Sequence, residues 1–163
     1  MGKVSMPLIH RSPSLILGSV PIRLYLLGLK AFMFGDLDAC YQLGEALSTG
    51  ELHGTTIKKN DTAAAWWYAR AARKGHSDAQ YELGFMYLLG EGVAHNAIEG
   101  LRWMSAAAEQ GHAEPMRVLA DSYGSGKFGV EPDRALAAQW TARLSAHLEQ
   151  RPDDRRQYER QRY

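Results

Sequence analysis

The sequence is poor in three features that would have pointed to a particular chemistry. It has one cysteine, Cys40, which excludes an internal disulfide framework and a CxxC site, and we interpret this thiol as buried and inert. Nineteen basic and 18 acidic residues leave a net charge of +1, so no overall field draws the chain to nucleic acid or to an anionic membrane. Because no apolar run approaches the length of a membrane-spanning helix, we expect no membrane insertion.

Motifs for catalysis or metal binding are also missing. None of the six histidines forms an HxxxH or HExxH pair that would place two ligands on one helix face. The stretch "GSGKFGV" (124–130) matches a glycine-rich loop, but its glycines end one predicted helix and precede another, whereas a phosphate cradle follows a strand. We therefore predict no catalytic residue, no metal, no cofactor and no small-molecule ligand.

The sequence does contain internal repeats. Gly75-His76 recurs as Gly111-His112 after 36 residues, and "AQYELGFMYLLG" (79–90) repeats "ACYQLGEALSTG" (39–50) after 40. Tryptophan recurs in step, at the three positions Trp67, Trp103 and Trp140. A period of 36 to 40 residues is typical of helical repeat arrays.

One unit shows what each repeat builds. Ala79, Leu83 and Tyr87 are spaced by four residues and form one apolar helix face. Gly84 recurs as Gly44 and Ala120, and this small residue predicts close approach of two helix backbones. "GEGV" (90–93) then breaks the helix, and a second helix from about 96 to 110 begins at an N-cap asparagine and ends at a glycine. No strand-like alternation appears, so each unit is a pair of antiparallel helices.

These residues resemble a known family. The pattern A-x-Y-x-L-G-x-x-Y-x-x-G-x-G-V…A-x-x-W-x-x-x-A-A-x-x-G-H-x-x-A is similar to the Sel-1-like repeat, a relative of the tetratricopeptide repeat, with departures at Gly100 and Pro115. The resemblance implies an all-α, right-handed α-solenoid over residues 21–150. Its repeats are expected at about 39–75, 79–111 and 116–147, with degenerate flanking helices, an irregular leader (1–20) and a charged tail (151–163).

The resemblance also implies a function. We expect a non-catalytic adaptor or scaffold that binds another protein on the concave face of its repeats, in a bacterial secretion, envelope or toxin-immunity system. Nucleic acid is not an expected partner. The alternative is a hydrolase of the cell-wall or lactamase-like type with an unrecognised active site. We expect a cytoplasmic protein, or an exported one if the N-terminal apolar stretch acts as a signal.

Candidate binding residues come from positions that differ between repeats on the first helices, which the resemblance places on the concave face. They are Gln42, Glu45, Glu82, Phe85, Leu89 and Asp121. A groove with exposed Phe85 and Leu89 between acidic residues would suit an apolar side chain beside a lysine or arginine. The exposure of these two apolar residues can equally be incidental.

Trp66 is a separate candidate. We interpret Trp67, Trp103 and Trp140 as repeat core, but the positions equivalent to Trp66 are polar. Trp66 is therefore either covered by the long loop 49–60 or an anchor for the partner protein.

Overall fold

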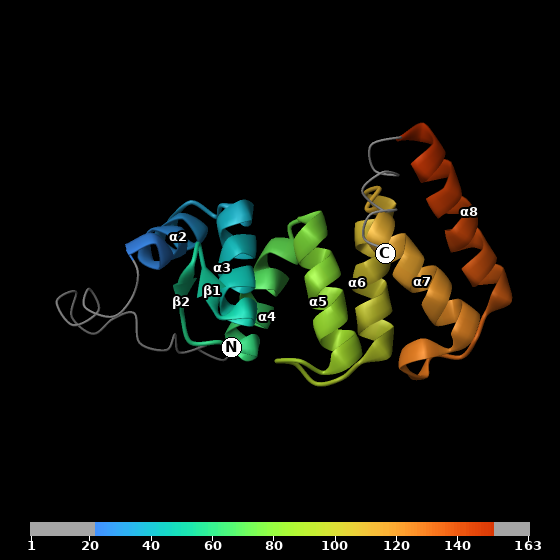
Figure 1. Cartoon of the computed structure of the whole chain (residues 1–163), viewed down its shortest axis with the longest axis horizontal. Coiled ribbons are helices and arrows are strands. Elements are labelled where there is room, and N and C mark those ends of the chain that lie inside the picture. The colour runs from blue at the N-terminus through green and yellow to red at the C-terminus, as the bar shows by residue number, and fades with distance from the viewer. Residues whose placement is uncertain (1–21, 152–163) are drawn as a thin grey trace, which may run out of the picture.

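The computed structural model describes residues 22–151, so the leader at 1–20 and all but the first residue of the tail lie outside the described residues. The predicted all-α solenoid is confirmed: helices stand side by side along one axis, each roughly antiparallel to the next (Figure 1). The elements are α2 (Ile22–Met33), α3 (Leu37–Thr49), β1 (Glu51–Leu52), β2 (Thr55–Thr56), α4 (Asp61–Ala72), α5 (Ser77–Leu89), α6 (Ala97–Glu109), α7 (Ala113–Ser125), a 3-10 turn (Lys127–Gly129) and α8 (Arg134–Gln150).

The helices pack in consecutive pairs. α3 packs on α4, α5 on α6 and α7 on α8, while contacts of α4 with α5 and of α6 with α7 join the pairs. α2 packs on α3 in the position that a second helix takes in the other pairs. Two apolar clusters form the core, one around Leu83 and one around Leu119.

The predicted start and stop signals set the helix ends. Asn60, Asn96 and Asp133 cap α4, α6 and α8, and each side chain accepts a backbone N–H of the first turn. Gly75 and Gly111 follow the second helices with φ values of 93° and 88°, which favour glycine. The chain therefore turns at the same place after α4 and after α6.

The predicted close approach of helices is confirmed at two glycines. A Cβ placed on Gly44 would lie 2.6 Å from ring carbons of Tyr68, which is one helix along. A Cβ on Gly84 would lie 3.1 Å from the carbonyl oxygen of Gly100 and from Met104. At Gly44 a Cβ would clash with the Tyr68 ring, and at Gly84 it would be tightly packed, so the small residues let α3 meet α4 and α5 meet α6 closely.

The loop 49–60 differs from the expectation of no strand. It contains a two-residue hairpin in which Glu51 pairs with Thr56 and Leu52 with Thr55. His53 and Gly54 at its tip both have positive φ, the combination that joins antiparallel strands in a tight turn. A run this short gives no alternation for the sequence to show.

The tryptophans are less uniformly buried than predicted. Trp140 is 8% exposed and belongs to the core, but Trp67 and Trp103 are only partly buried against it. Trp66 is 44% exposed, so the loop 49–60 does not bury it. Its ring lies edge-on to Trp67, with centroids 4.6 Å apart.

Candidate functional site

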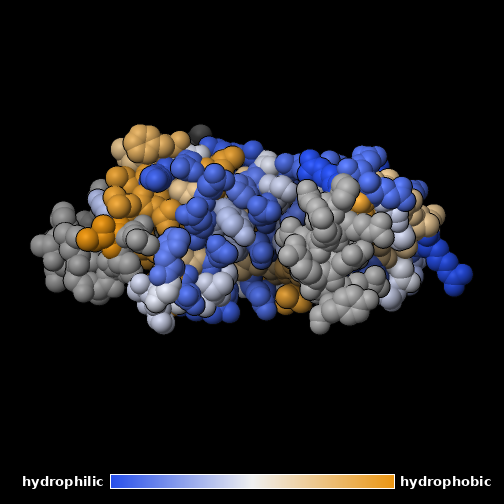
Figure 2. Space-filling view, turned by 45° about the horizontal axis from the view of Figure 1, so that its top comes forward, coloured by the Kyte–Doolittle hydropathy of each residue, from blue (hydrophilic) through white to orange (hydrophobic). Residues whose placement is uncertain are grey.

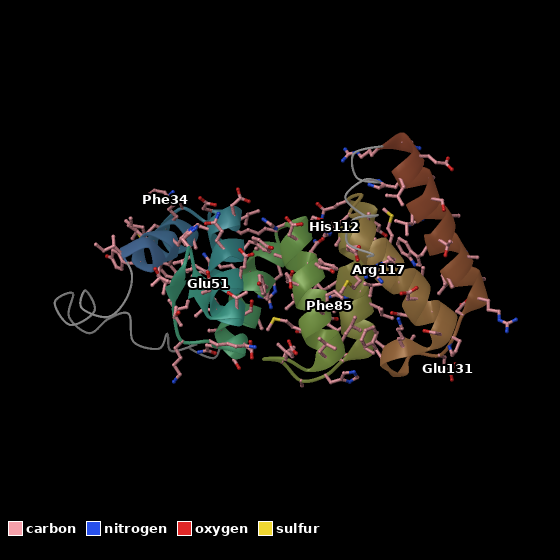
Figure 3. The ribbon with its side chains drawn as sticks, in the orientation of Figure 1. Phe34, Glu51, Phe85, His112, Arg117 and Glu131 are labelled. Carbon is pink, nitrogen blue, oxygen red and sulfur yellow. The ribbon has the colours of Figure 1, made fainter. Side chains whose placement is uncertain are left out.

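A hollow of about 430 Å³ lies across the first helices of three consecutive pairs. It is lined by Tyr41 of α3, by Asp78, Tyr81 and Glu82 of α5, and by His112, Glu114 and Arg117 at the start of α7. Figure 3 shows His112 and Arg117 in the middle of the molecule, well away from Phe34 at the α2 end. The hollow is thus a feature of the repeat array and not of a terminus.

On the α3 side, an aspartate, a tyrosine and a histidine form a fixed cluster. The backbone N–H of Ala79 donates to Nδ1 of His76 at 3.2 Å, so this histidine caps α5. Its Nε2 lies 3.2 Å from Oδ1 of Asp38, and its ring stacks on Tyr41 with centroids 5.0 Å apart. Because both ring nitrogens have partners, His76 is held in one orientation and serves as a structural histidine.

The same cluster recurs one repeat later, with one bond missing. His112 lies edge-on to Tyr81 at 5.1 Å, and its Nε2 lies 3.9 Å from Asp78. The residue three positions on is Pro115, which has no N–H to donate. Nδ1 of His112 is therefore buried without a hydrogen-bond partner among residues 22–151.

Burial lowers the pKa of His112 below its usual range, although the nearby carboxylates of Asp78 and Glu114 act in the opposite direction. The neutral imidazole is thus the favoured form within the fold, since the charged form would lose its hydration there. A neutral ring gives no compensation to the negative charge of Asp78, whose carboxylate lies 3.9 Å from its Nε2.

Glu82 is the most perturbed carboxyl in the hollow. Its pKa is raised, first by burial and then by the negative charges of Glu45 and Asp78. In the described part of the chain, no hydrogen bond or ion pair joins Glu82 to another side chain. A half-buried carboxylate without a partner destabilises the fold, and such groups are concentrated at functional sites.

The basic side chain that lines the hollow, Arg117, is already engaged. Its guanidinium lies 2.7 Å from Glu114 and 3.3 Å from Asp121, so two carboxylates share its charge. Burial raises the pKa of Tyr41 and of Tyr81 to about 12, which keeps both phenols neutral. The hollow therefore combines excess negative charge with two aromatic rings.

The structure places the predicted residues in different surroundings. Glu82 lines the hollow, and Glu45 lies near enough to raise its pKa. Asp121 borders the same side through its ion pair with Arg117. Gln42 is exposed on α3. These four stay candidates for contact with a partner.

The other three predicted residues are not part of the lining. Phe85 is not the exposed residue that the sequence suggested: it is half-buried against the second core cluster and lies edge-on to Tyr81 at 4.9 Å. Leu89 is exposed at the last position of α5. Trp66 projects from α4, a second helix, whereas the lining comes from α3, α5 and the start of α7.

Sequence reasoning missed most of the lining, namely Tyr41, Asp78, Tyr81, His112, Glu114 and Arg117. The signal was present, because Asp38 and Tyr41 recur together as Asp78 and Tyr81 after 40 residues. A histidine follows each pair at an equivalent turn. Each residue type alone is a weak signal, and only the joint recurrence of all three indicates a cluster.

Two features bear on chemistry. Among residues 22–151, no group of three histidine, cysteine, aspartate or glutamate side chains is arranged to hold a metal ion. Burial raises the pKa of the Cys40 thiol despite the nearby Arg70, so the thiol form dominates near neutral pH.

Comparison with known proteins identifies the repeat. A family model described as the Sel1 repeat matches residues 37–76, 77–112 and 116–146, which is more than half of the chain. The chain belongs to the Sel1 repeat family. Among solved structures, a Sel1 repeat protein from Oxalobacter formigenes is 32% identical, with a TM-score of 0.64, over 79% of this chain and 92% of that one.

Other similar proteins are larger or more distant. A protective antigen present in uropathogenic Escherichia coli strains is 26% identical with a TM-score of 0.53, covering 76% of this chain and 33% of that one. Cysteine-rich protein B of Helicobacter pylori, at 22% identity and a TM-score of 0.54 over 61% of this chain and 73% of that one, shares the fold. Chitin synthase regulatory factor 3 of Schizosaccharomyces pombe is 37% identical over 71 residues, 44% of this chain but only 8% of that protein's length.

Proposed function

We propose that this Sel1 repeat protein is a non-catalytic adaptor that binds a segment of another protein in the hollow across α3, α5 and α7. Sel1 repeat proteins generally mediate protein–protein interaction. The specific proposal adds the chemistry of the bound segment, which we infer to carry a lysine or arginine side chain at the hollow.

The unpartnered carboxylate of Glu82 carries this proposal. Its raised pKa shows that the fold disfavours its charge, with Glu45 and Asp78 adding repulsion. A cation from a partner would relieve both the desolvation and the repulsion. Such a charge lowers the stability of the free protein and favours binding of a group of opposite charge. Binding sites commonly sacrifice stability for function in this way.

The aromatic rings of the hollow also favour a cationic side chain as the ligand. Tyr41 and Tyr81 line the hollow beside the carboxylates, and the face of a tyrosine ring attracts an ammonium or guanidinium group. A phosphate backbone would meet Asp78, Glu82 and Glu114 instead, so nucleic acid is disfavoured as a partner.

The setting in which this binding operates is part of the proposal. We place it in a bacterial secretion, envelope or toxin-immunity system. The three similar solved structures come from bacteria, and one of them is described as a protective antigen.

Glu82→Gln tests the proposal because it removes the charge but keeps the shape. A displayed peptide library is selected against the wild-type chain, and we expect the enriched peptides to share a lysine or arginine at one position. Binding of these peptides to the Glu82→Gln variant should weaken by at least tenfold, since loss of one partner of a desolvated charge pair costs roughly 2–5 kcal/mol. The melting temperature of the variant should rise, because a disfavoured charge is gone.

The matched control is Glu131→Gln, an exposed carboxylate on the loop before α8 and far along the molecule from the hollow (Figure 3). This control should change neither peptide binding nor the melting temperature. Selection of peptides without a basic residue, or equal binding by the wild type and Glu82→Gln, would refute the site.

A hydrolase is the second candidate, and the same residue favours it. A carboxyl with a raised pKa beside the neutral His112 is the kind of group that general acid catalysis uses. The two functions separate in one comparison. In an enzyme, Glu82→Gln would abolish turnover and leave ligand binding close to wild type, whereas in an adaptor it weakens binding itself.

A further inference from the structure

The surface of α2 differs from that of the other second helices. Gly35, Gly75 and Gly111 end α2, α4 and α6 at equivalent turns, so a residue of α2 corresponds to the residue 40 positions later in α4. The outward positions of α4 and α6 include polar residues, such as Arg73 and Glu109. The corresponding outward position of α2 is Met33, and apart from Lys30 its exposed neighbours on that face are also apolar.

The exposed apolar residues form one group, which we call the α2 patch. It consists of Ile22, Tyr25, Leu26, Leu29, Phe32, Met33 and Phe34, with Trp66 of α4 at its border. Figure 2 shows these hydrophobic colours gathered at the α2 end, while the middle of that face is mostly hydrophilic. Single exposed apolar residues are ordinary on soluble proteins, but a contiguous group of this size marks a docking surface.

The α2 patch is bordered by positive charge. α2 has no acidic residue, and the first aspartate or glutamate of the whole sequence is Asp36. Lys30 is exposed on α2, and the guanidinium of Arg70 lies 5.8 Å from the ring centroids of both Phe32 and Trp66. Arg73 and Lys74 are exposed at the adjacent end of α4.

The acidic residue that follows α2 in the sequence, Asp36, does not cancel this charge. Asp36 accepts the backbone N–H of Ala39 at 3.0 Å and so caps α3. Its charge is stabilised by the start of that helix. The border of the patch therefore keeps an excess of basic side chains.

We propose that the α2 patch docks this protein on the anionic surface of a lipid bilayer, with α2 lying in the plane of the interface. Apolar and aromatic side chains enter the boundary between headgroups and acyl chains, and lysine and arginine pair with anionic headgroups. The patch combines these two features on a helix of 12 residues, and no helix in the described part of the chain is long and apolar enough to cross a membrane.

A second copy of the chain is the weaker candidate for covering the patch. Two α2 patches facing each other would bring the Lys30 and Arg70 side chains of both copies together, with no carboxylate on α2 to pair with them. Like charges across an interface oppose association. The charge of the patch instead complements a surface of anionic lipids.

Vesicle binding by the full chain tests the proposal. The protein is sedimented with vesicles of phosphatidylcholine alone and of phosphatidylcholine mixed with phosphatidylglycerol. We expect binding to the mixed vesicles that weakens as salt is added, and little binding to phosphatidylcholine alone. Leu26→Glu should weaken binding by roughly tenfold or more, since it removes a leucine that would enter the bilayer interface and adds repulsion from the anionic lipids. Lys30→Gln should weaken it by about fivefold.

The matched pair is Ile22→Glu and Ile98→Glu. Both isoleucines are exposed, at 63% and 83%, and occupy equivalent positions in α2 and α6, but only Ile22 belongs to the patch. Ile22→Glu should weaken vesicle binding, and Ile98→Glu should leave it unchanged. All these variants should melt within a degree or two of wild type because their side chains are exposed.

Three results would overturn the proposal. Equal binding to both kinds of vesicle, or equal effects of Ile22→Glu and Ile98→Glu, would show that the patch does not recognise an anionic surface. A dimer in light scattering that Leu26→Glu dissociates would assign the patch to a second copy. A large fall in melting temperature on Leu26→Glu would show that other parts of the same chain cover it. Peptide binding in the hollow is measured without vesicles, so the two proposals fail independently.

Discussion

Two glycine-to-alanine substitutions of the same chemistry should change stability in opposite directions. Alanine favours a helix interior over glycine by about 1 kcal/mol. At Gly124 in α7 a new Cβ would lie 3.7 Å from the Cβ of Ala137, an ordinary contact, so Gly124→Ala should gain most of that amount. At Gly44 the new Cβ would lie 2.6 Å from two ring carbons of Tyr68.

The Tyr68 ring has little room to move away from an alanine at position 44. It is 2% exposed, its hydroxyl lies 3.3 Å from the hydroxyl of Ser48, and its ring packs against that of Tyr41 with centroids 5.8 Å apart. Overpacking of a core costs roughly 1–3 kcal/mol. After the helical gain is subtracted, we expect Gly44→Ala to lose about 1 kcal/mol.

The assay compares the melting temperatures of the two variants, followed by the helical circular dichroism signal. A difference of about 2 kcal/mol between them corresponds to roughly 4–8 °C for a chain of this size. Urea unfolding checks that the slope of the transition, which reports the exposed area, is unchanged. If Gly44→Ala proved as stabilising as Gly124→Ala, the close packing of α3 on α4 would be wrong.

Two further predictions concern His112 and the tryptophans. Burial holds the pKa of His112 below its ordinary value of 6.5, so the unfolded chain takes up a proton there before the folded chain does. Stability should therefore decline as the pH falls below 6.5, measured by urea unfolding, and His112→Gln should flatten that part of the profile; an unchanged slope would count against the burial of this ring. Trp140→Ala should cost about 3–5 kcal/mol because that side chain is 8% exposed, whereas Trp66→Ala, at 44% exposed, should cost under about 1 kcal/mol. Equal losses in melting temperature at the two sites would contradict this difference.

The helices could be predicted because their signals are local. Each capping residue, such as Asn96, lies within three residues of the N–H that it accepts, and each terminal glycine, such as Gly111, is fixed by its own backbone angle. The period of the repeat then supplies the pairing of helices, since equivalent residues must lie in equivalent places. The small residues Gly44 and Gly84 also predicted the close packing of helices that the structure shows.

The site could not be predicted in the same way. Phe85 lies opposite the core face of its own helix, which suggested exposure, but in a stacked array that opposite side meets the neighbouring repeat. The hollow depends on Tyr41, Glu82 and Arg117 from three different helices, and the distances among them come from how the pairs rotate along the array. No single helix pattern contains that information.

Comparing equivalent positions of the repeats distinguishes residues needed for packing from candidates for binding. Where the repeats agree, as at Leu43, Leu83 and Leu119, each side chain is buried and its conservation of type is explained by packing. Several positions where they disagree lie at a surface instead: Glu82 at the hollow, and Leu26 and Trp66 at the α2 end.

The variable residues at the hollow and those at the α2 end both lower the stability of the free protein. Glu82 carries a charge that the fold disfavours, and α2 exposes apolar side chains to water. The first cost is relieved by a cation and the second by an apolar phase bordered with negative charge. Because the two surfaces lie on different parts of the array, one ligand cannot relieve both costs. Together, the two proposals describe a connector, with a partner segment in the middle of the array and a bilayer surface at the α2 end.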